Sequence, residues 1–302
     1  MTEYERIAEK RGWSQQVQDE VKCDFLVTSK MRKVQLIGLD LLLEFDRVCR
    51  EHQLKYFLIG GTLLGAIRHK GFIPWDDDID VAMLRKDYER FLEIAPHEFS
   101  EPYFLQTPDT DPGYYFAHTK VRNSNTSAIS YAFRYERFNQ GIAIDIFPLD
   151  NARLEDLEER YTKINHLILE NSANMRRSNP NPTEEDLRRM AKYPYRNPME
   201  VWTEMDAEAR RYEHEETEYV NIALCTIYVA PKLCYAKNLF DDVANACFEG
   251  YMLPVPSGYQ EVLKQQYADY MVYPSVEQRG TWHSSVWIDP DVSYKSIQVN
   301  SQ

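Results

Sequence analysis

In the first part of the chain, stretches with the apolar spacing typical of helices alternate with stretches typical of strands. Between residues 31 and 52 apolar side chains recur at steps of three and four, with charged residues between them, which predicts an amphipathic helix. Residues 54–59 are typical of a short strand, which is expected to stop at Gly60-Gly61. A short helix over 62–68 is predicted to begin at that double glycine.

Beyond this helix the pattern changes twice. A glycine and a proline predict a loop at 69–75. A strand rich in apolar residues is expected at 79–83, followed by an amphipathic helix around 87–94. Alternating isoleucines at 142–147 predict another strand, closed by Pro148.

The composition shifts after about residue 151. The segment 151–218 is highly charged, helical in pattern and interrupted by prolines, so we expect a helical insertion or lobe. Short apolar strands and a tyrosine-rich stretch return in the last third. The pattern predicts an α/β (α+β) fold, a sheet flanked by helices, with four parts: an N-terminal helical segment packed on the core (1–53), the core itself (54–150), a mainly helical lobe (151–245) and a C-terminal segment that returns to the core (246–302).

Charge and composition narrow the class of protein. The 302 residues carry 48 acidic and 35 basic side chains, a formal net charge of −13 at pH 7, which argues against a general nucleic-acid binder. The longest largely apolar run, 56–67, is too short to span a bilayer, and the first residues lack the apolar segment of a secretory signal. The five cysteines include no CxxC pair, so neither a zinc site nor a disulfide framework is expected. We therefore expect a cytoplasmic protein whose contact with a membrane is at most peripheral.

Three aspartates in close succession are the main candidates for chemistry. Side chains on a strand alternate between faces, so Asp76, Asp78 and Asp80 are predicted to share one face. Carboxylates held together repel one another unless a cation neutralises them, and hard oxygen ligands select Mg²⁺ or Mn²⁺. The alternative is a solvated acidic loop that caps the next element. The alternation of acidic and apolar residues from Asp78 to Val81, and the upstream double glycine that lets phosphate approach the backbone, favour the metal site.

Two further aspartates follow in the strand predicted at 142–147 and just after it. Asp145 lies among isoleucines and faces opposite to them. A buried aspartate is costly unless a cation or a hydrogen-bonded partner compensates it, and both remain open for Asp145. Asp150 is expected to cap a helix that begins near residue 151.

Basic residues cluster in two places. One cluster is formed by Arg68, His69 and Lys70, and the other by Lys120 and Arg122, which alternate onto one face of a candidate strand at 119–123. Arginine binds phosphate bidentately, whereas lysine contributes a point charge. In a chain this acidic, we interpret Arg68, Lys120 and Arg122 as phosphate ligands, while His69 could equally be a surface residue.

These residues carry a resemblance to a known family. Gly60-Gly61-Thr62 followed by Asp78-Ile79-Asp80 resembles the nucleotidyltransferase-fold signature, with a longer gap than usual between the glycines and the aspartates. The block from Gly61 to Asp80 is similar to the LicD family of phosphocholine transferases and its fukutin-related relatives. Two further blocks match the same family, at 144–150 and 120–126, and a looser match runs from 253 to His283. The resemblance covers about 54–150 well and 250–285 weakly.

The resemblance implies a mixed sheet flanked by helices and a Mg²⁺-dependent transfer of a phospho-alcohol from a CDP-activated donor to a glycan hydroxyl. It places Asp78 and Asp80 as the metal pair, Asp145 as the third carboxylate that can hold a second ion or act as base, and Asp76 as an assisting residue. Gly60, Gly61 and Thr62 would approach the diphosphate. The acceptor would be a teichoic acid, lipopolysaccharide or other surface polysaccharide precursor, and a lipid-linked acceptor would bring the protein to the inner face of the cell membrane.

The alcohol, which could be choline, ribitol or glycerol, is not defined by the sequence. The 21 tyrosines and Trp75 invite an aromatic cage for choline, although aromatics at this density mostly fill cores and line sugar sites. Two other functions remain open, a nucleotidyltransferase that attaches a nucleoside monophosphate and a non-catalytic nucleotide-binding module. Release of CMP from a CDP-alcohol, release of pyrophosphate from a nucleoside triphosphate, and binding without turnover distinguish the three.

Overall fold

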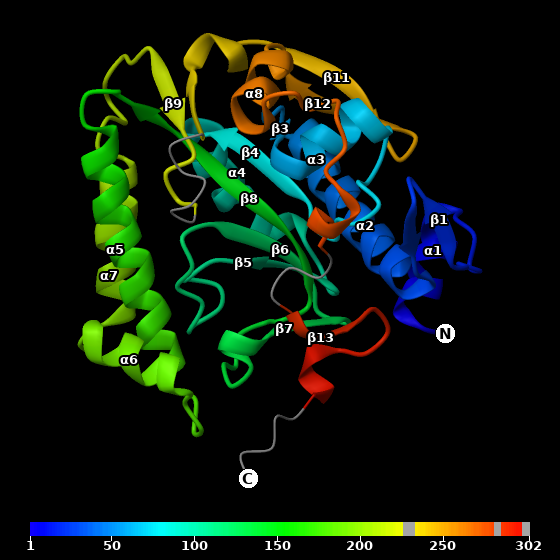
Figure 1. Ribbon diagram of the computed structural model, residues 1–302, viewed down its shortest axis with the longest axis horizontal. Coiled ribbons are helices and arrows are strands. Elements are labelled where there is room, and N and C mark those ends of the chain that lie inside the picture. The colour runs from blue at the N-terminus through cyan, green and yellow to red at the C-terminus, as the bar shows by residue number, and fades with distance from the viewer. Residues whose placement is uncertain (226–232, 281–284, 298–302) are drawn as a thin grey trace.

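A seven-stranded mixed sheet forms the centre of the protein in the computed structural model, which describes residues 1–225, 233–280 and 285–297 (Figure 1). Five of its strands follow the order β10-β9-β8-β4-β3, and β6 pairs with β8 and β5. The strands are β3 (Phe57–Leu58), β4 (Asp80–Leu84), β5 (Tyr103–Gln106), β6 (Thr119–Asn123), β8 (Ile142–Ala152), β9 (Tyr219–Asn221) and β10 (Cys234–Ala236). Only β4 and β8 are parallel among these pairs, so the predicted mixed sheet is confirmed.

The long strand β8 organises the sheet because three strands pair with it. It runs parallel to β4 on one edge, and on the other edge it pairs first with β6 and then with β9. The prediction that Pro148 closes this strand is wrong. The N–H of Asp145 points to β4, so position 148 would point its N–H to the other edge, between the last β6 pair at Ile146 and the first β9 pair at Asp150. Proline is tolerated there because no ladder hydrogen bond is lost.

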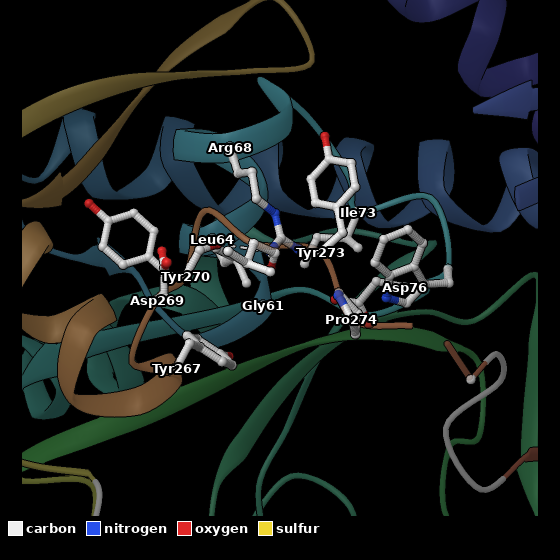
Figure 2. Close-up of a pocket in the computed structure, with 13 residues that line it drawn as sticks. Gly61, Leu64, Arg68, Ile73, Asp76, Tyr267, Asp269, Tyr270, Tyr273 and Pro274 are labelled. Carbon is white, nitrogen blue, oxygen red and sulfur yellow. Dashed lines mark hydrogen bonds between the residues drawn. The ribbon is translucent and has the colours of Figure 1, made fainter. Parts of the chain in front are cut away.

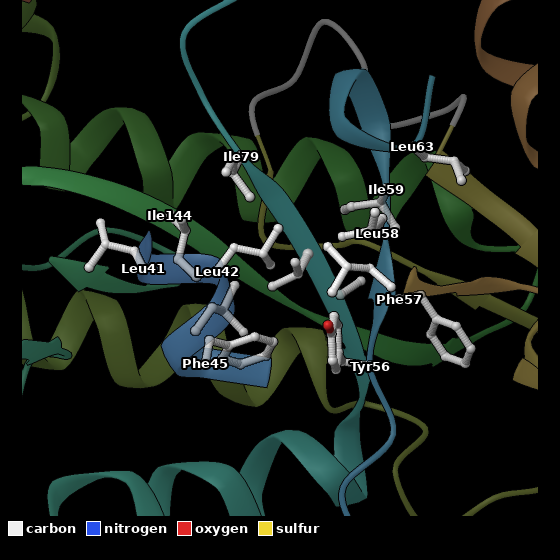
Figure 3. Close-up of a cluster of buried hydrophobic side chains, with 14 of the residues drawn as sticks. Leu41, Leu42, Phe45, Tyr56, Phe57, Leu58, Ile59, Leu63, Ile79 and Ile144 are labelled. Carbon is white, nitrogen blue, oxygen red and sulfur yellow. The ribbon is translucent and has the colours of Figure 1, made fainter. Parts of the chain in front are cut away.

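The main core lies between the sheet and the helices α2 (Ser29–Glu51) and α4 (Arg85–Glu98). The hydroxyl of Thr28 accepts the N–H of Met31 and caps α2, whose apolar face contacts β6 and β8. Figure 3 shows the fully buried Leu41, Leu42 and Phe45 of α2 facing the strand residues of the core. The helix predicted at 31–52 and the strands predicted at 79–83 and 119–123 are therefore present, within a few residues of the expected bounds.

The charged segment after residue 151 forms a stack of helices beside the sheet, drawn in green at the left of Figure 1. These are α5 (Leu157–Arg176), α6 (Glu184–Lys192) and α7 (Pro198–Ala209), with a small core of their own between α5 and α7. The buried guanidinium of Arg160 donates to the carbonyls of Glu208 and Ala209 at the end of α7, which joins the two helices. Strands β9 and β10 also fall within 151–245 but extend the central sheet.

The terminal segments pack around this framework. The N-terminal α1 (Glu3–Arg11) contributes Tyr4 and Ile7 to the main core. Smaller elements are β1 (Glu20–Lys22), β2 (Phe25–Val27), β7 (Ser127–Ser130), β11 (Val243–Phe248), β12 (Tyr251–Pro256), β13 (Ser285–Asp289), α8 (Tyr259–Tyr267), and the short turns η2 (Tyr131–Phe133), η4 (Lys237–Phe240), η5 (Val276–Gln278) and η6 (Tyr294–Ser296). The five cysteines are free thiols. In the part of the chain that the structure describes, every helix is too short or too polar to cross a membrane.

Candidate active site

The double glycine forms a tight bend that lies directly against two aspartates. It opens the short helix α3 (Gly60–Leu64), which continues as the π-helical turn η1 (Gly65–His69), so the helix predicted at 62–68 begins two residues earlier. Gly60 has φ +56°, and a Cβ there would lie 3.0 Å from Oδ2 of Asp80. A Cβ on Gly61 would lie 2.5 Å from Oδ2 of Asp76. Both positions require glycine because the backbone closes onto the carboxylates.

Three charged residues form a row across neighbouring strands. Asp80 is the first residue of β4 and pairs with Asp145 of β8, which pairs in turn with Lys120 of β6. Directly paired residues point to the same face of a sheet, so this charged row of Asp80, Asp145 and Lys120 shares one face. The hydroxyl of Thr62 accepts the backbone N–H of Asp80 at 2.9 Å, which ties the glycine bend to the start of β4. This hydroxyl is buried and acts on the protein backbone.

Asp76 and Asp78 reach the site from a loop, which corrects the prediction that they alternate with Asp80 on a strand. Residues 76–79, the aspartate loop, have no regular secondary structure, and β4 begins only at Asp80. The side-chain amide of Gln35, on α2, donates to the carbonyl of Asp76 at 2.8 Å. The loop is therefore held at Asp76 by α2, and at its other end the carbonyl of Ile79 accepts the N–H of Asp145 on β8 at 2.8 Å.

The carboxylates of Asp76, Asp78, Asp80 and Asp145 repel one another electrostatically although they come from a loop and two strands. Burial raises the pKa of Asp80 well above its ordinary value, and the negative charges of Asp78, Asp145 and Asp76 raise it further. A cation would relieve this repulsion, so the donor set fits a divalent metal ion by charge and by ligand type. Across the described residues, no three His, Cys, Asp or Glu side chains converge into a ready-made metal centre. The metal pair Asp78 and Asp80 stays a prediction.

Asp145 differs from the other aspartates because its charge is compensated. Its Oδ1 forms an ion pair with Lys120, and its Oδ2 lies 3.0 Å from Nε2 of His118. Burial favours the neutral carboxyl, but Lys120 and His118 outweigh this effect and hold the pKa of Asp145 well below its usual range. A carboxylate with so low a pKa is a weak proton acceptor, which disfavours the role of base implied by the resemblance.

The sequence did not single out His118, although a signal was present. His118 immediately precedes β6 and is two residues from Lys120, a spacing that puts side chains of an extended chain on one face, and both meet Asp145. Burial lowers the pKa of His118, which favours the neutral imidazole despite the nearby Asp145. Its ring also packs against Phe147, with centroids 4.6 Å apart.

A first cavity of about 750 Å³ opens on the glycine-bend side of the aspartates (Figure 2). Gly61 and Asp76 line it together with aromatic residues from α8 and the segment after it, which are Tyr267, Tyr270 and Tyr273. Arg68 also lines the cavity and donates to the carbonyls of Tyr270 and Val272, at 2.8 and 3.1 Å. The predicted phosphate ligand thus also fastens the C-terminal segment over the site.

Trp75 and Tyr273 belong to the aromatic wall of this cavity, and His69 packs against both. The ring of His69 stacks on Tyr273 with centroids 5.2 Å apart and meets Trp75 edge-on. Burial, together with the adjacent guanidinium of Arg68, lowers the pKa of His69 to about 4, so this ring is neutral at physiological pH. The guanidinium of Arg279 lies 4.5 Å from the centre of the Trp75 ring, so one aromatic face already carries a cation of the protein.

A second cavity of about 310 Å³ is also lined by aspartates. Its charged lining consists of Asp77, Asp78, Asp145, Lys120 and Arg122. Lys120 and Arg122 share a face of β6, as the sequence predicted, but Arg122 is buried and donates to the side-chain oxygen of Gln106 and to the carbonyl of Gly141. The two predicted groups of phosphate ligands therefore lie in different cavities.

Two remaining expectations have different outcomes. Asp150 is wrong as a helix cap, because it lies within β8 and is 1% exposed. Its carboxylate accepts two hydrogen bonds from Arg85, at 2.6 and 2.8 Å, so it compensates a buried guanidinium. His283 lies outside the described residues.

A clamp distant in sequence holds the loop that leads to the aspartates. The carboxylate of Glu249, at the β11–β12 turn, accepts the N–H of Phe72 at 3.0 Å and pairs with Arg32 of α2. The N–H of Glu249 donates to the carbonyl of Lys70 at 2.9 Å. No local pattern could have indicated this clamp, because its parts are brought together only by the fold.

Comparisons with known proteins agree with this geometry. A family model described as LicD/FKTN/FKRP, nucleotidyltransferase domain, matches residues 53–196, and so runs beyond residue 150 through α5 and α6. The chain is similar to the lipopolysaccharide cholinephosphotransferase LicD of Haemophilus influenzae, with 29% identity over 256 residues that cover 84% of this chain and 96% of that protein. It is also similar to an uncharacterised protein of Rickettsia typhi, with 35% identity over 81 residues (27% of this chain, 23% of that protein), and to one of Rickettsia prowazekii, with 38% identity over 56 residues (18% and 21%).

Proposed function

Residues 53–196 belong to the LicD/FKTN/FKRP nucleotidyltransferase domain family, and from this premise we propose that the protein transfers a phospho-alcohol from a CDP-activated donor to a glycan hydroxyl. Phosphocholine is the first candidate for the transferred group, because the similar protein of Haemophilus influenzae is named a cholinephosphotransferase. The acceptor would be a precursor of a cell-surface glycan. A lipid-linked precursor would bring the protein to the inner face of the cell membrane.

The observation that carries the proposal is the position of Asp80. It pairs with Asp145 on the parallel strand β8 and touches the glycine bend at Gly60, while Asp78 and Asp76 raise its pKa from the adjoining loop. Acidic side chains beside a glycine bend are what phosphoryl transfer requires, since the bend admits the diphosphate and the carboxylates hold the cation that neutralises it.

Asp78 and Asp80 would hold a Mg²⁺ or Mn²⁺ ion, which when bound would stabilise the negative charge that develops on the phosphoryl oxygens. The backbone of Gly60 and Gly61 would contact the diphosphate, since Gly61 lines the first cavity and has no side chain of its own. Arg68, on the same cavity wall, would direct its charge toward the nucleotide side of the donor.

In the transfer step, the acceptor hydroxyl oxygen forms a bond to the phosphorus that carries the alcohol. The bond from that phosphorus to the oxygen of CMP breaks, CMP leaves with the electron pair, and the hydroxyl gives its proton to solvent water. The protein's part is to hold both reactants beside the aspartates, which line the first and the second cavity.

The aromatic wall of the first cavity supports choline as the alcohol. Tyr267 and Tyr270 line the cavity beside Asp76, and the faces of aromatic rings attract a quaternary ammonium. Trp75 contributes less to such a cage, because Arg279 already lies over its ring.

The test is a panel of CDP-choline, CDP-glycerol and CDP-ribitol with Mg²⁺, in which thermal stabilisation and release of CMP are measured. We expect one member of the panel to stabilise the protein and to release CMP when acceptor is present. Asp78→Asn should abolish release with the fold intact, whereas Asp242→Asn, an exposed aspartate beyond the site, should retain it. Full activity of the Asp78 variant would refute the assignment.

The same panel separates the two alternative functions. Pyrophosphate release from CTP or ATP would instead identify a nucleotidyltransferase, and binding without turnover would identify a non-catalytic module.

A further inference from the structure

Arg122 is a buried cation whose hydrogen bonds go to neutral acceptors, while the carboxylates of Asp145 and Asp111 act on it only electrostatically. Its side chain is 7% exposed, yet no ion pair with a described Asp or Glu involves it. Its recorded hydrogen bonds go from Nε to the side-chain oxygen of Gln106 and from Nη1 to the carbonyl of Gly141, both neutral acceptors. The guanidinium lines the second cavity. A buried charge without a directly bonded counter-ion is costly, so we expect an anionic ligand to bind this guanidinium.

The acidic residues near Arg122 are already engaged. Asp145 is paired with Lys120. Asp111 is one side chain further away, where it accepts a hydrogen bond from the amide of Gln106 at 2.6 Å. The arginine therefore keeps its Nη2 without a described protein acceptor, and the cavity is the direction in which an acceptor can enter.

The rest of the second cavity suits a sugar-sized ligand. Its volume of about 310 Å³ is at the small end of typical ligand sites. Gln140 and Ser130 provide polar groups, and the rings of Phe116, Phe133 and Phe138 form an apolar wall of the kind on which sugars stack. The cavity also includes Asp78 and Asp145 but neither glycine of the bend, so a molecule bound there would reach the aspartates away from the glycine bend.

We propose that the second cavity is the acceptor site and that it selects an acceptor carrying an anionic group, a phosphate ester on the glycan, which Arg122 binds through its guanidinium. The inference rests on the proposed function, in which the donor occupies the first cavity. It adds the position of the acceptor and its charge. The phosphate of the donor is the competing source of the same chemistry, and the experiment separates the two.

The experiment uses the full-length protein and isothermal titration calorimetry with three probes. Glucose 1-phosphate represents a phosphorylated sugar, inorganic phosphate the bare anion, and methyl glucoside the uncharged sugar. Each is titrated with and without saturating CMP and Mg²⁺, which stand for the donor's nucleotide part. We expect glucose 1-phosphate to bind the wild-type protein in both conditions and methyl glucoside to bind far more weakly.

Two variants locate the probe. Arg122→Gln should weaken glucose 1-phosphate binding by about 10- to 100-fold, the range for a lost charge-assisted hydrogen bond. Ala143→Leu should weaken it too, because Ala143 pairs directly with Arg122 across the strands and lines the same cavity, so that added volume fills the site while the arginine network stays intact. The matched control Arg153→Gln removes an exposed guanidinium that is paired with Glu215, and it should bind like the wild type.

The outcomes are distinct. Displacement of glucose 1-phosphate by CMP would place the anion in the donor site and overturn the inference, as would no binding to the wild-type protein, or unchanged binding to the Ala143 variant in a folded protein. Binding of CMP with Mg²⁺ to both variants as to the wild type would show that only the acceptor side is affected. Failure of CMP to bind, or of any CDP-alcohol to release CMP, would instead count against the proposed function.

Discussion

Asp80→Asn removes one negative charge from the most crowded carboxylate of the site and keeps the size of the side chain. We expect this change to stabilise the protein in the absence of divalent cations and to abolish phosphoryl transfer. The physical reason is that burial and the charges of Asp78, Asp145 and Asp76 all disfavour the ionised form of Asp80. The ionised carboxylate therefore destabilises the folded wild-type protein.

The size of the effect follows from the pairing of Asp80 with Asp145. Residues on neighbouring strands lie about 5 Å apart, and two unit charges at that separation and an effective dielectric constant of about 20 repel by roughly 3 kcal/mol. Lys120 offsets part of this repulsion through its ion pair with Asp145, while Asp78 adds to it. We therefore expect Asp80→Asn to raise the free energy of unfolding by about 1–3 kcal/mol.

Urea denaturation followed by tryptophan fluorescence measures the effect, once in EDTA and once in excess Mg²⁺. In EDTA the variant should unfold at a higher urea concentration than the wild type. Mg²⁺ should stabilise the wild type and have little effect on the variant, because a ligand stabilises only the state that binds it. Asp242→Asn serves as the matched control, since this exposed aspartate should change stability by less than about 0.5 kcal/mol.

Two results would refute the reasoning. If Asp80→Asn were less stable than the wild type in EDTA, the carboxylates would not repel one another in the folded protein. If Mg²⁺ stabilised both proteins equally, the cation would bind elsewhere. Either result would remove the electrostatic basis of the metal pair, whatever the activity of the variant.

Two further substitutions test the packing of the site. Asp150→Asn removes the charge that accepts two hydrogen bonds from the buried Arg85, which keeps its ion pairs with Glu89 and Asp206. Urea denaturation should therefore show a loss of about 1–3 kcal/mol, and an unchanged midpoint would contradict the buried pair. Gly61→Ala places a Cβ 2.5 Å from the carboxylate of Asp76, so it should weaken CMP binding in the presence of Mg²⁺, measured by calorimetry. Gly280→Ala, at the mouth of the first cavity, meets nothing within 4 Å and should bind CMP like the wild type, and equal affinity of both alanine variants would argue against a close approach of the nucleotide to the bend.

Much of the fold follows from local pattern. The three- and four-residue apolar spacing of α2 and the alternating isoleucines of β8 are visible in the chain because each element has one buried face. The double glycine and the run of aspartates also indicated a candidate site, and the structure places the bend directly against Asp76 and Asp80. Pro148 was misinterpreted for a related reason, since its effect depends on whether a neighbouring strand needs its N–H.

Only the tertiary structure decided which side chains meet. Asp80 pairs with Asp145, and Asp145 pairs with Lys120. These residues come from three separate strands, and the register between the strands is set by the sheet and not by the local sequence. The partner of Asp150 is Arg85, and a local pattern could indicate only a helix cap at that position. A sequence determines the residue types and the local periods, whereas compensation of buried charge depends on distances across the whole chain. For that reason a candidate site could be proposed from the sequence, and the division of its basic residues between two cavities could not be predicted.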